Sequence, residues 1–219
     1  MPEKTTRVRL IYEKRDRACF VPHVSLSTLF ARAARRAGMG LSRTEGFSPR
    51  AKTSFGPELP AGVVALNEPV DMWFFEWDFP GDLAEAFDAQ MPDGFRVKRC
   101  GLMPEGAPAL GKECRAAHYL VWARNGPFAS AGTGAAELLT YMKRHYGESI
   151  LNGYVEEAVF SRVSVVLANP AQNGIGGLVK ALIADRVVAG WHDMCIVRAC
   201  LGRWNGEQME PIEEGCRVL

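Results

Sequence analysis

Six basic residues that lie close together in the chain have the chemistry to bind phosphate groups. Guanidinium groups form bidentate hydrogen bonds to phosphate oxygens, and a lysine ammonium adds a point charge. Three of the arginines are spaced i, i+3 and i+4, so a helix would place them on one face. The segment predicts a nucleic-acid or phosphate surface; the alternative is a solvated face partly paired with Glu45 and Glu58. The six residues are Arg32, Arg35, Arg36, Arg43, Arg50 and Lys52.

Three side chains of the same region offer other chemistry. Phe47 has an aromatic face on which any base can stack. Phe47 and Phe55 could equally anchor their loop to the core, which is the more common role of such aromatics. His23 stands at the start of an expected helix, where an imidazole can act as a general acid or base near pH 7. The alternative for His23 is a hydrogen bond that caps the helix.

A glycine-bearing loop between an expected strand and an expected helix is a second candidate for phosphate binding. Its glycines are Gly174, Gly176 and Gly177. Bare backbone N–H groups at a helix start can hold phosphate. The loop lacks a full G-x-G-x-x-G pattern, so an ordinary turn is the alternative. No spacing typical of a metal site is visible, and the sequence predicts no metal and no cofactor.

Composition and charge narrow the class of protein. The chain of 219 residues is 47% hydrophobic and 23% charged. Such values are those of ordinary globular proteins. No apolar run is long enough for a membrane span, and the polar start predicts a cytoplasmic chain without a signal peptide. The six cysteines contain no C-x-x-C pair, which indicates small buried thiols. Residues 1–56 hold 12 Lys/Arg against 4 Asp/Glu, so this end either meets an anionic partner or packs against the acidic remainder.

Hydrophobic periodicity predicts an α+β protein built from two ferredoxin-like (βαββαβ) halves, with antiparallel sheets and helices on one face. The halves are expected at residues 1–103 and 113–204, joined by a Gly/Pro linker. A loosely held acidic tail is expected at 205–219. One strand of the first half is expected either at 53–55 or as a split of the long segment 63–79. The other expected strands are 7–13, 94–101, 115–124, 149–155, 158–168 and 194–203, and the expected helices are 22–37, 82–91, 135–146 and 177–187.

Residues 43–62 form the most distinctive stretch of the sequence. Glycine supplies backbone angles with positive φ and proline fixes φ, so this density of both predicts an ordered loop. Ordered loops beside a rigid scaffold often carry function. The glycines and prolines are Gly46, Pro49, Gly56, Pro57, Pro60 and Gly62.

The segment 1–75 resembles the family of radical-SAM-linked proteins, DUF2344. The resemblance lies in Val8-Arg-Leu, Phe20-Val-Pro-His23, the arginine helix 31–38, Glu45-Gly-Phe-Ser-Pro49 and Ser54-Phe-Gly-Pro-Glu-Leu-Pro-Ala-Gly-Val63. It implies a bacterial cytoplasmic protein of unassigned activity. In that family the domain is often fused to, or encoded beside, a B12-binding-type radical SAM protein, near genes for ribonuclease E/G and ribosomal proteins.

The chain departs from the family pattern at two places. The usual S-H-L-D becomes Pro22-His23-Val24-Ser25 and loses its acid, and the usual N-P-H becomes Ser48-Pro49-Arg50 and loses a histidine. These changes weaken a catalytic role for that acid and the two histidines, whereas Arg50 strengthens an anion-binding one.

Three functions follow as expectations. The first is an RNA-binding accessory protein for tRNA or rRNA processing or modification, working with a separate radical SAM protein. The second is a metal-independent endoribonuclease that uses His23, since CRISPR RNA-processing enzymes share a double ferredoxin-like layout. The third is a non-catalytic scaffold for another protein. The sequence leaves the oligomeric state open.

Overall fold

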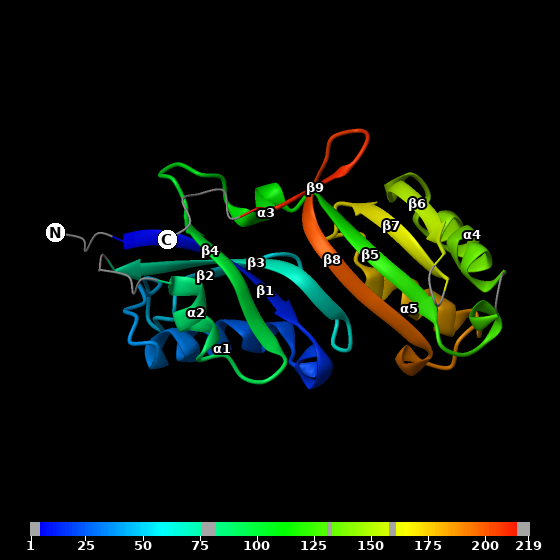
Figure 1. Cartoon of the computed structure of the whole chain (residues 1–219). Helices are drawn as coiled ribbons and strands as arrows, with labels where there is room; N and C mark the ends of the chain where they lie inside the picture. Colours follow the sequence, from blue (N-terminus) through cyan, green and yellow to red (C-terminus); the bar gives the residue numbers. More distant parts are fainter. Residues whose placement is uncertain (1–4, 76–81, 131–132, 158–160, 214–219) are drawn as a thin grey trace.

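The first half of the chain is a ferredoxin-like unit in the computed structural model (Figure 1). Its strand order is β4-β1-β3, with the short β2 on the far side of β3, and all these pairs are antiparallel. The sequence predicted this βαββαβ order, and β2 shows which of the two expected positions holds the extra strand. The elements are β1 (Thr5–Lys14), α1 (His23–Arg36), β2 (Thr53–Phe55), β3 (Val64–Phe75), α2 (Leu83–Asp88) and β4 (Phe95–Leu102).

The second half repeats the same arrangement. Its strand order, β8-β5-β7-β6, matches that of the first half position for position. The prediction of two ferredoxin-like halves in an α+β protein is confirmed. The elements are β5 (Ala116–Ala123), α4 (Gly134–Tyr146), β6 (Ile150–Glu156), β7 (Arg162–Ala168), α5 (Ile175–Ala184) and β8 (Met194–Trp204).

The structure describes residues 5–75, 82–130, 133–157 and 161–213. Three parts of the expected elements lie outside these ranges: residues 76–79 of the long strand, residues 158–160, and the end of the tail from residue 214.

The two halves share one nine-stranded sheet, which the sequence did not predict. β3 and β8 pair in parallel, with Val64 opposite Val197 and Ala65 opposite Arg198. This pairing is possible because β2 covers β3 only at residues 70–72 and leaves the start of the same edge free. Figure 1 shows β3 and β8 side by side at the centre of the molecule.

The helix boundaries follow from local signals. In α1, Leu26, Phe30 and Ala33 are buried at helical spacing, which places the apolar stripe on the sheet. The chain then turns at Gly38, whose φ is 77°. Glycine is the usual residue for such a left-handed turn at a helix end. Helix α2 begins after Asp82, whose Oδ1 accepts the Glu85 backbone N–H at 2.9 Å, a standard N-cap bond.

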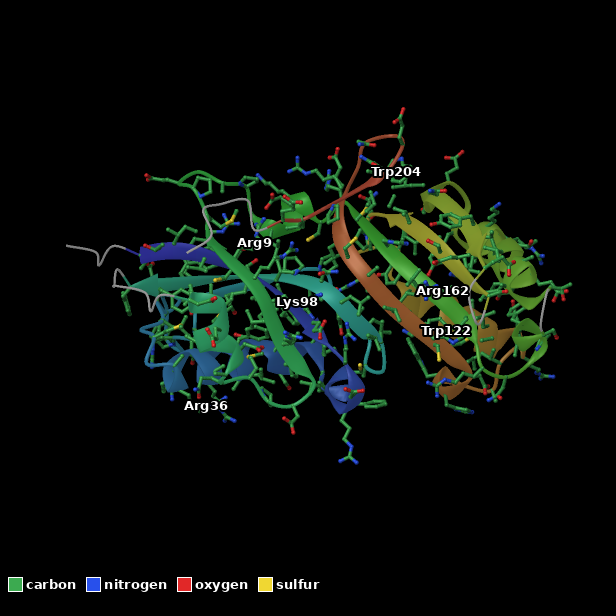
Figure 2. All side chains as sticks on the ribbon, in the orientation of Figure 1. Arg9, Arg36, Lys98, Trp122, Arg162 and Trp204 are labelled. Atoms are coloured by element: carbon green, nitrogen blue, oxygen red, sulfur yellow. The ribbon has the colours of Figure 1, made fainter. Side chains whose placement is uncertain are left out.

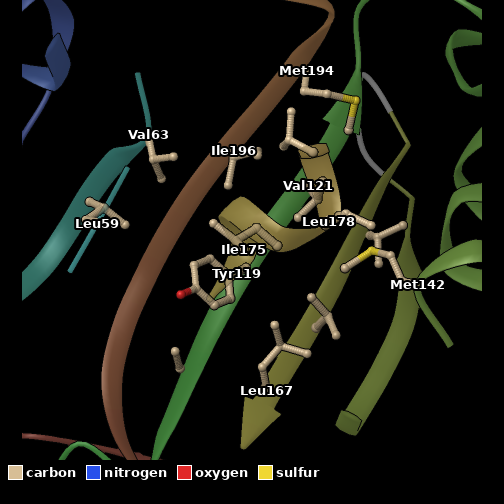
Figure 3. Packing of buried hydrophobic residues seen from close by; sticks show 14 of the residues in the cluster. Leu59, Val63, Tyr119, Val121, Met142, Leu167, Ile175, Leu178, Met194 and Ile196 are labelled. Atoms are coloured by element: carbon tan, nitrogen blue, oxygen red, sulfur yellow. The ribbon is translucent and has the colours of Figure 1, made fainter. Parts of the chain in front are cut away.

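The loop of residues 56–62 between β2 and β3, here called the Gly/Pro loop, connects the halves by packing. Leu59 and Val63 precede β3, yet both are buried in the core of the second half, beside Ile196 and Tyr119 (Figure 3). Gly56 lies so close to this core that a Cβ there would approach Leu201 Cδ1 to 2.6 Å. The second family-like block, residues 54–63, therefore serves as the joint of the molecule.

A buried ion pair closes this joint. Arg198 of β8 donates from Nε and Nη2 to the two carboxylate oxygens of Glu68 at 2.7 and 2.6 Å. Its Nη2 also donates to the Pro57 carbonyl at 2.9 Å. Arg198 is 1% exposed and Glu68 is 3% exposed. Burial lowers the pKa of Arg198, but the charges and hydrogen bonds of Glu68 and Tyr119 together raise it above its usual value, so the guanidinium stays charged.

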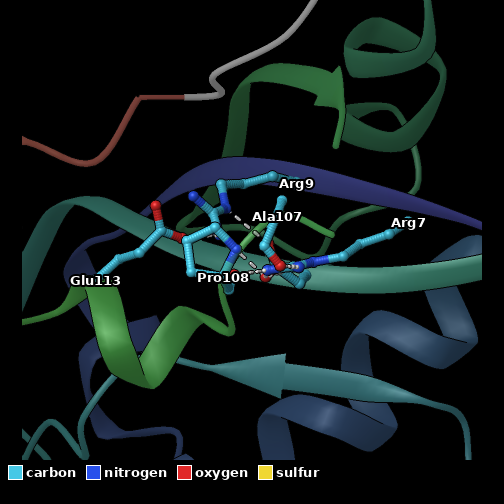
Figure 4. A network of polar contacts seen from close by, with 6 residues as sticks. Arg7, Arg9, Ala107, Pro108 and Glu113 are labelled. Carbon is cyan, nitrogen blue, oxygen red and sulfur yellow. Dashed lines mark hydrogen bonds and ion pairs between the residues drawn. The ribbon is translucent and has the colours of Figure 1, made fainter. Parts of the chain in front are cut away.

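A second polar network covers the other face of the first half (Figure 4). The Asp71 carboxylate is fully buried and accepts hydrogen bonds from Arg7 and Arg9, with Arg9 Nε at 2.7 Å. Arg9 Nη2 also donates to Glu113 Oε2 at 2.6 Å, on the short α3 (Leu110–Glu113). Arg7 Nη1 donates to the Ala107 carbonyl at 2.9 Å. The expected linker is thereby fastened to the sheet.

A short strand forms within the expected tail, so the expectation that the tail is loosely held is wrong for residues 209–211. β9 (Met209–Pro211) pairs with β8 from Gly202 to Trp204. A Cβ at Gly202 would collide with the Glu210 carbonyl, so only glycine lets the two backbones approach this closely.

The joint makes a prediction about stability. Arg198→Met leaves the Glu68 carboxylate buried without its partner, so we expect a loss of about 3–5 kcal/mol in the free energy of unfolding. Urea unfolding followed by circular dichroism measures it. The double variant Glu68→Met/Arg198→Met removes both charges and should recover most of the loss.

The matched control is Arg203→Met, which changes an exposed arginine of the same strand. We expect it to cost little. A double variant no more stable than Arg198→Met would show that the ion pair is not the source of the effect.

Candidate nucleic-acid interface

One wall of a groove on the first half is an exposed face of α1. Its lining residues recur every three or four positions, which is the spacing of a single helix face. They are Val24, Ser27, Thr28, Ala31, Arg32 and Arg35.

The opposite wall is a hairpin that leaves the sheet. Leu41 bridges Phe74 and β2 begins at Thr53, and Ser42 and Lys52 bond to the Trp73 backbone. Residues 43–51 therefore bulge out between two pairings with the same edge of β3. The hairpin is held by Lys52 N–H to the Ser42 carbonyl and Thr44 N–H to the Arg50 carbonyl, each at 2.8 Å. We call the space between α1 and this hairpin the arginine groove. Its volume is about 880 Å³, and its remaining lining residues are Met39, Gly40, Leu41, Arg43, Pro49, Arg50 and Ala51.

The arginine groove is basic on both walls. Arg32 and Arg35 come from α1, and Arg43 and Arg50 come from the hairpin. None of the lining residues is acidic. Within the described ranges none of these four guanidinium groups forms an ion pair, so the expected alternative of pairing with Glu45 and Glu58 is not realised. Unpaired like charges repel, and such a cluster gains stability when an anion enters.

The two other basic residues of the six are engaged elsewhere. Arg36 does not line the arginine groove and donates to the Gln90 carbonyl beyond α2. Lys52 places its Nζ 5.1 Å from the ring centroid of Trp73, a cation–π distance. The structure thus brings four of the six predicted residues together.

The basic residues of the first segment lie on both sides of the sheet. Arg7 and Arg9 form ion pairs with Asp71, and Arg9 also pairs with Glu113, in the network described above. The groove arginines lie on the other side of the sheet, with α1. Figure 2 shows this division, with Arg9 above the sheet and Arg36 of α1 below it. Packing against the acidic remainder therefore accounts for Arg7 and Arg9, whereas an anionic partner stays a prediction for the groove arginines.

The two aromatic residues have different environments. Phe55 packs edge-on against Phe30 at 5.6 Å between ring centroids, so it anchors β2 to the core. Phe47, at the tip of the hairpin, is fully exposed. The anchoring role expected of such residues holds for Phe55 and is wrong for Phe47.

His23 is the first residue of α1 and does not line the arginine groove. Its ring meets Phe55 at 5.7 Å, and burial lowers its pKa, with a smaller opposing effect from the charge of Glu58. The imidazole is therefore neutral near pH 7. In the described part of the chain, its ring nitrogens form no hydrogen bond that would orient them for proton transfer.

The three glycines near α5 lie in the second half, away from the arginine groove. Gly176 packs against the Gly/Pro loop, since a Cβ there would stand 3.3 Å from Pro60 Cγ. The Gly174 carbonyl accepts the Tyr146 hydroxyl at 3.2 Å. The Gly177 N–H donates to the same carbonyl at 3.0 Å, in the first turn of α5. Packing against the loop gives Gly176 a structural reason to be small.

Sequence reasoning missed the uncharged part of the groove. Val24, Thr28 and Ala31 share the face of the predicted arginines, so the helical spacing could have identified them. Met39 and Leu41 also line the groove, because the chain turns back along α1 after Gly38. No pattern in the sequence predicts this turn.

Two kinds of feature are absent from the described residues. No cluster of three or more His, Cys, Asp or Glu side chains in those ranges is placed to hold a metal ion. No helix there combines the length and apolar character needed to cross a membrane.

Fold and groove together define a double ferredoxin-like α+β protein with a basic groove in its first half. The family described as "Uncharacterized protein conserved in bacteria (DUF2344)" matches residues 7–154, and the chain belongs to that family. No curated protein matches the chain.

Solved structures give weak similarities. An unknown protein from Galdieria sulphuraria is 13% identical, with 88% of this chain and 96% of that one covered and a TM-score of 0.27. The ligand-free regulatory subunit of aspartate kinase from Thermus thermophilus is 13% identical, with 81% and 91% covered and a TM-score of 0.27. The same subunit from Thermus flavus is 12% identical, with 82% and 94% covered and a TM-score of 0.27. Similarities of this size carry no argument about function.

His23 makes a prediction about pH. We expect its imidazole to titrate below the ordinary histidine range in the folded protein, because burial lowers its pKa. NMR of the ring protons measures this. Because the unfolded chain takes up this proton first, His23 should destabilise the fold as pH falls through the ordinary range and have no such effect above it.

Phe55→Ala exposes the ring and should move the pKa of His23 back up. Phe47→Ala removes an aromatic ring that does not contact His23, so it should leave the titration unchanged. An ordinary pKa in the wild-type protein would contradict the buried position of the ring.

Proposed function

We propose that this protein binds RNA through the arginine groove, in the cytoplasm, as an accessory to a separate radical SAM enzyme that processes or modifies tRNA or rRNA. The observation that carries the RNA part is the convergence of Arg32, Arg35, Arg43 and Arg50 on two facing walls. Phosphate groups neutralise such a cluster and accept bidentate hydrogen bonds from it.

The groove suits a polyanion for a further reason. Its arginines come from two separate elements, so an anion with several charges along its length can engage both walls at once. Glu45 lies in the hairpin but does not line the groove, so it leaves the basic walls unopposed. Arg50 stands where the family pattern has a histidine, which adds one more phosphate donor to the groove.

The proposed partner and location have separate support. The radical SAM link rests on the resemblance of residues 8–63 to proteins that are often fused to, or encoded beside, such enzymes. The cytoplasmic location accords with free thiols at Cys19, Cys114 and Cys200, which lie buried without disulfides. Burial raises the pKa of Cys114 to about 12 and that of Cys200 to about 11. These two thiols therefore stay protonated and unreactive.

The endoribonuclease alternative has less support from the geometry. His23 packs on Phe55 outside the groove, so RNA held by the arginines would not meet its ring directly.

Salt dependence tests the RNA proposal. Four phosphate contacts on a single strand give a slope near −2.8, or about 50-fold weaker binding between 50 and 200 mM salt. Fluorescence anisotropy with labelled bulk tRNA measures it. Arg35→Glu/Arg43→Glu removes two of the four contacts, so it should weaken binding more than tenfold and reduce the slope by about 1.4.

The control variant is Lys143→Glu/Arg144→Glu, which reverses two exposed charges on α4 and changes the net charge equally. It should bind nearly as the wild type does. Equal losses in both variants, or binding without a salt slope, would show that the groove is not the site.

The partner proposal has its own test. We expect a tagged radical SAM protein from the same cell to co-purify with this chain and to be released by ribonuclease if RNA bridges them. A complex that resists ribonuclease and survives Arg35→Glu/Arg43→Glu would favour the scaffold alternative. Absence of the enzyme before and after ribonuclease would contradict the link.

A further inference from the structure

Phe47 lacks a structural reason for its position. It is fully exposed at the hairpin tip, two residues before Pro49, which lines the arginine groove. Among the described residues no other aromatic ring packs against its side chain. Gly46, just before it, has a φ of 113°. Glycine adopts this angle readily, so the hairpin turns sharply here and presents the aromatic residue at its end.

The groove has the size of a ligand of a few nucleotides. Its volume is about 880 Å³. Sites that enclose small ligands have volumes of roughly 300–1,000 Å³. The stretch of α1 from Val24 to Arg35 spans about 16 Å along the helix axis. A single strand can lie between two walls of this length, whereas a duplex offers its phosphates on a broad outer surface.

From these observations we infer that the arginine groove binds an unpaired RNA strand, with the arginines on its phosphates and Phe47 stacked on one of its bases. This inference rests on the proposed function and specifies its substrate. Only an unpaired base offers its face to an aromatic side chain, because the bases of a duplex are stacked on one another.

The lining also indicates little preference for base sequence. Besides guanidinium groups, which this inference assigns to the phosphates, base edges are usually read by amide or carboxylate groups in fixed geometry. No Asn, Gln, Asp or Glu lines the groove. Of its two hydroxyl residues, Ser27 is already hydrogen-bonded to Thr53 at 2.9 Å. Phosphate contacts and stacking accept any sequence, so unpaired segments of many RNAs should bind.

The test compares one labelled 12-nucleotide RNA, free of self-complementarity, with the same strand annealed to its complement. Anisotropy at 50 mM salt should show the single strand binding at least tenfold more tightly. Phe47→Ala should weaken single-strand binding by roughly tenfold, the usual loss of one base–aromatic stack, and leave the duplex unchanged. Phe47→Tyr keeps the aromatic face and should bind as the wild type does.

Phe20→Ala is the matched control, since Phe20 is 70% exposed but lies before α1 and outside the hairpin. It should leave both affinities unchanged. Equal or tighter duplex binding would overturn the inference, and so would full single-strand affinity in Phe47→Ala. In either case the proposed function still stands if binding remains steeply salt-dependent and requires the groove arginines. No binding of either RNA at 50 mM salt overturns both and leaves the basic walls to a protein partner.

Discussion

The buried pair of Arg198 and Glu68 is the interaction on which the rest of the arrangement depends. It joins a strand of the second half to a strand of the first, and the same guanidinium holds the Pro57 carbonyl. Leu59 then enters the core of the second half, so the Gly/Pro loop has a fixed course. β2 directly precedes this loop, so a fixed loop also fixes the position of Thr53 in β2. The Thr53 hydroxyl is hydrogen-bonded to the Ser27 hydroxyl of α1. The Arg198–Glu68 contact in the middle of the sheet thus helps to fix the positions of both walls of the arginine groove.

The basic residues of the first segment illustrate how one kind of side chain serves two purposes. On one face of the sheet Arg7 and Arg9 are matched by Asp71 and Glu113, and they fasten the linker to the strands. On the other face the groove arginines have no acidic neighbours in the lining, so their charge is available to a partner. A count of charge along the sequence cannot separate these two groups, because alternation along β1 and the spacing of α1 send them to opposite faces.

Local periodicity made much of the fold predictable. The sequence predicted three features that depend on residues near one another in the chain. They are the apolar stripe of α1, the Asp82 cap and the repeated βαββαβ order. The parallel pairing of β3 with β8 and the pairing of β9 with β8 could not be predicted from local patterns. Both depend on how separate segments of the chain meet in space. The same limit applies to the site. Helical spacing placed Arg32 and Arg35 on one face, but only the hairpin's exit from the sheet brought Arg43 and Arg50 opposite them.

The most direct test of the account is to map where RNA touches the protein. Ultraviolet crosslinking to bulk tRNA at 50 mM salt, followed by mass spectrometry of the digested protein, identifies the contacting peptides. The account predicts crosslinks in residues 24–35 and 41–52, with Phe47 prominent because aromatic rings stacked on bases crosslink readily. Crosslinks confined to the second half, or none above an RNA-free control, would contradict it.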